Sequence, residues 1–132
     1  MLIALGVGWR ELGRSGGKAV PYRLVDLGPL VLTTAVATPT RKQTVLDKLL
    51  GAHLVRLPPG REAILISPGP RSSTGYDVEV LSIVEERSRI VVDVREVAPH
   101  LGEPVQGVVT YPYRLVMMPA SQKHVTIRWE DR

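Results

Sequence analysis

The chain contains no cysteine and no phenylalanine among its 132 residues. Without cysteine it can form no disulfide, thiolate nucleophile or cysteine-ligated metal site, and it offers no cysteine for a lipid anchor. Because phenylalanine is missing and aromatic residues make up only 5% of the chain, the core has to be built from aliphatic side chains.

Long apolar runs are also absent. No stretch reaches the roughly eighteen apolar residues that a membrane-spanning helix needs. The apolar N-terminus, residues 1–7, is short and is followed closely by Arg10 and Glu11, which does not fit a signal peptide. We therefore expect a cytoplasmic protein with no membrane partner.

Motifs for catalysis, metal binding and nucleotide binding are missing as well. Ser72 and Ser73 lack the Gly-x-Ser-x-Gly setting of a hydrolase nucleophile. The glycine-rich segment 13–18 lacks the Gly-Lys-Ser/Thr ending of a phosphate loop. Metal-ligand spacing is absent from the three histidines, which are His53, His100 and His124. We therefore expect no catalytic residue, no metal and no cofactor.

Positive charge is in moderate excess, with a formal net charge of +4 and a sequence pI near 9.8. Such a balance permits long-range attraction to nucleic acid. However, the basic residues are spread along the chain and interleaved with acidic ones, as in Glu85-Glu86-Arg87. We therefore expect an ordinary solvated surface rather than a nucleic-acid partner. A nucleic-acid-binding β-barrel is kept only as an alternative.

The most distinctive stretch that is present runs from residue 68 to residue 76. An apolar run, residues 63–66, leads into it, and an alternating run, residues 76–84, leads out. Its two prolines each fix one φ angle, and Gly75 can adopt a positive φ in a tight turn. We expect a stiff loop above a β-scaffold that presents Arg71, Ser72, Ser73 and Thr74.

Alternating apolar and polar residues predict a mainly β protein. The length fits a single domain, residues 1–132. The short elements and frequent turns predict an antiparallel sandwich or open barrel. Strands are predicted at 2–7, 20–25, 30–37, 63–66, 76–84, 90–95, 109–117 and 124–130. The strands at 76–84 and 90–95 are expected to form a hairpin with a turn at 85–88.

One short helix is predicted at about residues 40–50. Thr40 and Gln43 have the spacing of a capping box, and Gly51 supplies a C-terminal stop. The apolar side chains of the segment fall on one face.

Tyr111-Pro112-Tyr113 allows two interpretations. It could form an aromatic binding patch, or the two tyrosines could belong to the core or its rim with their hydroxyl groups bonded locally. Pro112 lacks a backbone donor, so it indicates an edge strand, a bulge or a cis bond.

Two separated motifs resemble the PrcB C-terminal domain family. They are Ser-Thr-Gly-Tyr-Asp-Val-Glu-Val at 73–80 and Thr-Tyr-Pro-Tyr-Arg-Leu-Val-Met-Met-Pro at 110–119. The resemblance covers residues 63–119, and a weaker similarity extends from Trp9 through the predicted helix. The family is named for a bacterial lipoprotein that stabilises a secreted protease complex. The resemblance therefore implies a bacterial protein that binds another protein, such as a protease, without catalysis of its own.

Residues 73–76 are also similar to a loop of chagasin-like inhibitors of cysteine proteases, which makes protease inhibition the first alternative. The favoured interpretation is a non-catalytic protein-interaction module. Its candidate protein-binding residues are Arg71, Ser72, Ser73, Thr74, Gly75, Tyr76, Tyr111, Pro112 and Tyr113.

Overall fold

A computed structural model describes residues 17–51 and 55–130 of the chain. The strand predicted at 2–7 and the residue His53 lie outside these ranges. In chain order the elements are β1 (Lys18–Ala19), β2 (Arg23–Leu24), β3 (Val36–Thr40), α2 (Gln43–Leu50), β4 (Arg61–Ser67), β5 (Asp77–Glu85), β6 (Arg89–Val97), β7 (Arg114–Pro119) and β8 (His124–Trp129).

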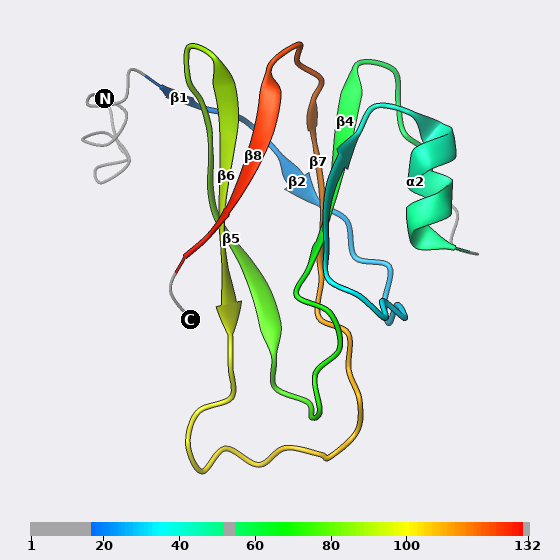
Figure 1. The fold of residues 1–132 in the computed structure, drawn as a ribbon, viewed down its shortest axis with the longest axis vertical. Coiled ribbons are helices and arrows are strands. Elements are labelled where there is room, and N and C mark those ends of the chain that lie inside the picture. The colour runs from blue at the N-terminus through cyan, green and yellow to red at the C-terminus, as the bar shows by residue number, and fades with distance from the viewer. Residues whose placement is uncertain (1–16, 52–54, 131–132) are drawn as a thin grey trace.

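The strands form two four-stranded sheets that pack face to face, as predicted for a sandwich. One sheet has the order β1-β5-β6-β8 and the other the order β2-β7-β4-β3. Helix α2 covers the outer face of the second sheet, so the molecule has three layers (Figure 1). Within the described residues the two sheets do not close into a barrel.

One strand pair departs from the antiparallel pattern, because β8 lies parallel to β6. After β6 the chain crosses to the other sheet and returns along it as β7, antiparallel to β4. A short turn then sends it back as β8 in the direction of β6 (Figure 1). Parallel neighbours need such a crossover connection, and here a strand of the opposite sheet supplies it.

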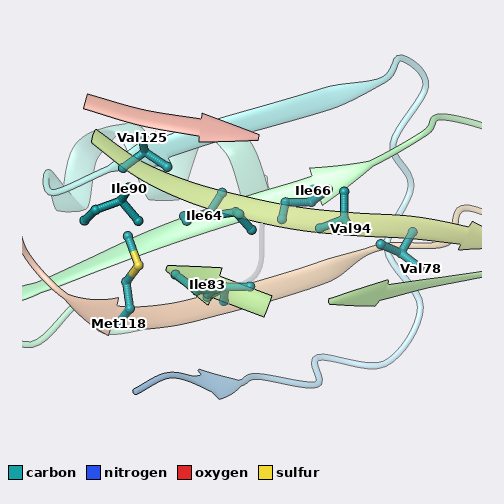
Figure 2. Packing of buried hydrophobic residues seen from close by; sticks show 10 residues of the cluster. Ile64, Ile66, Val78, Ile83, Ile90, Val94, Met118 and Val125 are labelled. Atoms are coloured by element: carbon teal, nitrogen blue, oxygen red, sulfur yellow. The ribbon is translucent and has the colours of Figure 1, made fainter. Parts of the chain in front are cut away.

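The core is aliphatic, as the lack of phenylalanine requires. Ile64 and Ile66 of β4 point between the sheets, where they meet a cluster shown in Figure 2. Ala63 and Leu65 point the other way, into a second cluster under α2. Strand β4 is therefore buried on both faces, which agrees with the apolar run at residues 63–66. The other buried members of the first cluster are Val78, Ile83, Ile90, Val92, Val94, Val116, Met118 and Val125.

The predicted capping box is wrong. Helix α2 begins at Gln43, and Thr40 is the last residue of β3. The Thr40 hydroxyl accepts a hydrogen bond from the Lys42 amide at 3.0 Å, which closes a turn before the helix. The Gln43 side chain bonds to the backbone of residues 55 and 57 instead. Gly51 does end the helix, with a φ of 68°.

The strand predicted at 20–25 is also wrong as a single element. Of this range only Arg23–Leu24 forms a strand, β2, while Val20 continues the pairing of the preceding β1 through a hydrogen bond to Ile83. The strands β1 and β2 lie at the edges of different sheets. Pro21 cannot donate to a ladder, so the chain leaves one sheet there and joins the other. In the strand predicted at 30–37, pairing begins only at Val36, because Leu30 and Leu32 pack beside the helix instead.

The strand predicted at 109–117 begins later, at Arg114. Before it, Thr110 makes an isolated antiparallel bridge with Arg71, and Pro112 has no amide to continue the pairing. No described peptide bond is cis. The β5–β6 hairpin and β8 follow the predictions, with a bulge at Leu81 added to β5. Among the described residues, no helix combines the length and apolarity needed to cross a membrane.

Among the described residues, Glu62 has a buried carboxylate oxygen, Oε1, without a hydrogen-bond partner. Glu62 lies near the start of β4 opposite Met118, and it is only 6% exposed. Burial raises the pKa of Glu62 above its usual value, against the opposing effects of Arg41 and a backbone hydrogen bond from Ser121.

We expect Glu62→Gln to stabilise the protein at neutral pH. A raised folded-state pKa means that stability is highest below the ordinary carboxyl pKa and is lost as pH rises through the raised value. The side-chain amide of glutamine carries no charge at any pH and therefore avoids this loss. The free energy of unfolding of the variant should exceed that of the parent by about 1 kcal/mol at pH 7 and by almost nothing near pH 4. Urea unfolding at the two pH values measures the difference. A variant less stable than the parent at pH 7 would show that attraction to Arg41 outweighs burial.

Candidate functional site

The loop at 68–76 lies at one end of the sandwich, together with the long connection that follows β6. Strands β4 and β6 both run towards this end, and β5 and β7 both leave it (Figure 1). Residues 68–76 and 98–110 therefore form one surface, here named the loop end. Its shape depends on how the two segments are joined.

Arg71 is the main link within the loop end. Its guanidinium group donates to Glu96 at 2.5 Å through Nε and at 2.9 Å through Nη2. The Glu96 side chain is 6% exposed and that of Arg71 25%, so the pair is largely shielded from water. The hydrogen bond from Arg71 to Glu96 raises the pKa of the guanidinium group. This two-bond geometry fixes the direction of the arginine as well as its charge.

Backbone and hydroxyl groups add further links between the two segments. The amide and carbonyl of Arg71 bond to Thr110 at 2.8 and 2.9 Å. Thr74 bonds to Gln106 in both directions, through its amide at 3.0 Å and its hydroxyl at 2.9 Å. The Thr110 hydroxyl donates to the carbonyl of Ser73 at 2.7 Å. The loop is thus pinned along most of its length.

Gly75 is required at its position for two reasons. Its φ is 97°, as predicted, in a region that side chains rarely adopt. A Cβ atom there would also lie 3.0 Å from the ring of Pro99 and 3.2 Å from Val105. The second reason could not be seen in the sequence, because it depends on the contact with the distant segment.

The structure places most of the predicted loop residues against their own chain. Arg71 faces Glu96 and lies 6.0 Å from the centre of the half-buried Tyr76 ring. Ser73 and Thr74 bond to the loop itself and to Gln106. Ser72 is exposed. The loop is therefore stiff, but it offers a shaped surface more than a row of free polar side chains.

Tyr111, Pro112 and Tyr113 follow Thr110, which bonds to the loop, but they are at least partly buried. Both tyrosines are half-buried and pack against the cluster under α2. The Tyr113 hydroxyl accepts from the Leu27 amide at 2.9 Å and donates to the Gly28 carbonyl at 2.8 Å. Pro112 is buried. This arrangement fits the interpretation of Tyr113 as a core or rim residue with a locally bonded hydroxyl.

Sequence reasoning missed the exposed apolar side chains of the loop end. Residues 98–110 carry four of them, which are Leu101, Val105, Val108 and Val109. Val105 lies directly beside Gly75, so this apolar surface adjoins the loop. The available signal was a cluster of branched side chains in a segment that is rich in glycine and proline and has no strand alternation.

Other features near the loop end offer little chemistry. A shallow groove of about 290 Å³ lies between the edge strands β3 and β8, lined by Ala35, Val36, Ala37, Ser67, Pro68 and Trp129. In the part of the chain that the structure describes, no three His, Cys, Asp or Glu side chains are grouped as a metal site. His100 and His124 are both exposed.

The two roles of Gly75 can be separated by comparison with Gly102. Gly102 also has a positive φ, but nothing lies within 4 Å of the place where its Cβ would be. Gly102→Ala should therefore cost only backbone strain, about 1 kcal/mol. Gly75→Ala adds crowding against Pro99 and Val105 and should cost about 2 to 3 kcal/mol. Urea unfolding of the two variants measures the loss of unfolding free energy in each. Equal losses would show that the crowding at position 75 does not reduce stability.

Comparison with known proteins gives one match. Residues 63–119 match the family model described as PrcB C-terminal. The matched segment begins in β4, includes the whole loop end and finishes with β7. No curated protein and no solved structure matches the chain. The resemblance predicted from the two motifs is confirmed, and residues 63–119 of this chain are a match to the PrcB C-terminal family.

Proposed function

We propose that this protein is a non-catalytic protein-interaction module that binds its partner through the loop end. The observation that carries the proposal is the exposed apolar surface of Leu101, Val105, Val108 and Val109 beside a pinned loop. Apolar groups that are grouped on a surface and bordered by polar ones are typical of protein-binding sites.

The pinned loop supports the same proposal on energetic grounds. A segment already fixed by the Arg71–Glu96 pair and by the bonds between Thr74 and Gln106 loses little conformational entropy when a partner binds. The free energy gained by burying Leu101 and the valines at 105, 108 and 109 would then not be offset by a cost of ordering the loop. A fixed shape also favours one partner surface over others.

A protease complex is the partner class that we propose. This part of the proposal rests on the family match, which includes all of the loop end, and on what the family's name implies. The module would stabilise or regulate the complex by contact.

The inhibitor alternative receives less support from the loop geometry. An inhibitory loop has to project side chains into a cleft, whereas Arg71 and Thr74 turn towards Glu96 and Gln106. The shallow groove beside β3 likewise supplies no cluster of converging polar groups of the kind that an enzyme site needs.

The test is a quantitative pull-down from a lysate of the source organism with matched variants. Leu101→Asp/Val108→Asp places two charges on the loop end. Val31→Asp/Leu81→Asp changes the same residue types at exposed positions elsewhere. We expect recovery of the partner to fall roughly tenfold or more with the first variant and to stay near the parent level with the second.

Circular dichroism and urea unfolding should first show that both variants are folded. If every captured protein is retained equally by the two variants, the loop end is not the binding surface. If a protein depends on the loop end but belongs to no protease complex, the module remains supported and the proposed partner class is wrong.

A further inference from the structure

The end of the sandwich opposite the loop end gathers basic side chains that are far apart in the sequence. It is formed where β3 finishes, β4 starts, β5 turns into β6, and β7 turns into β8 (Figure 1). Six exposed cations in these segments make no ion pair with any described residue. They define the basic end and are Lys18, Arg41, Lys42, Arg56, Arg61 and Arg87.

Contacts between the segments show that the basic end is continuous. Lys18 lies opposite Glu85 in the sheet, and Lys123 reaches the same glutamate at 2.9 Å from the β7–β8 turn. From that turn, the carbonyl of Ser121 accepts a hydrogen bond from Arg41 at 3.0 Å. The first sheet, the turn and the end of β3 are therefore neighbours.

The remaining cations join at the start of the helix and of β4. Arg61 lies opposite Pro119, the residue at which β7 ends. Gln43 bonds to the Val55 carbonyl and the Leu57 amide, which places Arg56 beside the first turn of α2. The basic end thus extends across all three layers of the molecule.

Few acidic groups oppose this charge. The same segments contain three glutamates: Glu85 pairs with Lys123 and also attracts Lys18, Glu86 pairs with Arg89, and Glu62 is buried. Asp47 borders them, because its carboxylate accepts a hydrogen bond from Gln43 at 2.9 Å. With Lys123 and Arg89 included, eight lysine and arginine side chains therefore stand against four acids. The other described residues include six cations and seven acids. The charge that is interleaved along the sequence is separated in space.

The chemistry of the basic end favours a phosphate backbone over a protein or a lipid surface. Protein contacts depend on buried apolar or aromatic anchors, and membrane-surface binding needs an apolar face to insert. None of the large exposed apolar side chains of the described residues belongs to the segments of the basic end. Lysine and arginine alone are sufficient for phosphate contacts, and the described segments of the basic end carry no exposed aromatic group that could stack on bases.

The spread of the cations fits a duplex. Stacked sheets lie about 10 Å apart, and α2 adds a third layer beyond them, so the cations extend over more than the roughly 12 Å width of a DNA major groove. They can reach phosphates of both strands. We propose that the basic end binds the phosphate backbone of double-stranded DNA without reading its sequence.

The test is fluorescence anisotropy of a labelled 20-base-pair duplex with the full chain at 50 to 200 mM KCl. Lys42→Ala/Arg61→Ala removes two cations of the basic end. Lys48→Ala/Arg95→Ala removes the same residue types and the same charge elsewhere. We expect the first variant to weaken binding at 50 mM salt about tenfold or more, and to make the slope of log affinity against log salt shallower by about two. The second variant should change affinity less than about threefold.

Arg87→Ala, at the hairpin tip on the other sheet, gives an independent check and should reduce the same slope by about one. The proposal is overturned if the parent protein does not bind the duplex at 50 mM salt, or if the two double variants lose affinity equally. It is also overturned if a polyglutamate peptide or vesicles of anionic lipid bind more tightly than the duplex.

Discussion

Strand β4 carries apolar side chains on both faces, and so it has to be covered twice. Ile64 and Ile66 need the opposing sheet, while Ala63 and Leu65 need the layer of α2. Because β3 and β7 pair with its two edges, the strand is enclosed on every side. The three-layer architecture follows from this one requirement, and the segments that enter and leave β4 contribute to the basic end and to the loop end.

A buried glutamate lies at each end of the core between the two sheets. On β6, the inward positions of Ile90, Val92 and Val94 continue to Glu96, and on β4 the inward face begins with Glu62. Glu96 meets Arg71 and so ties the loop to the opposite sheet. Loss of one partner from such a pair leaves an uncompensated buried charge. The Arg71–Glu96 pair therefore holds the loop in one position against β6.

The sequence could predict elements whose pattern is local. Strand β4, the β5–β6 hairpin and β8 follow from alternation and apolar runs, and the positive φ of Gly75 follows from the residue type. The end of β3 could not be predicted, because Thr40 has the spacing of a cap and yet pairs with Ala63. In the candidate site, the direction of Arg71 depends on Glu96, 25 residues away in the other sheet. The basic end could not be predicted either, because Arg41 and Arg87 are far apart in the sequence and only the fold brings them to the same end of the sandwich.

The parallel pairing of β6 with β8 has a consequence for how the chain folds. In the folded chain, residues 98–119 lie between β6 and β8 in sequence, and they cross to the other sheet and pair there as β7. These contacts are distant in the sequence, so forming them requires closure of a long loop, which slows folding. Until β8 has been synthesised and docked, one side of β6 keeps an unpaired row of backbone groups. A newly made chain in that state is exposed to edge-to-edge association, and β8 both completes the sheet and ends that exposure.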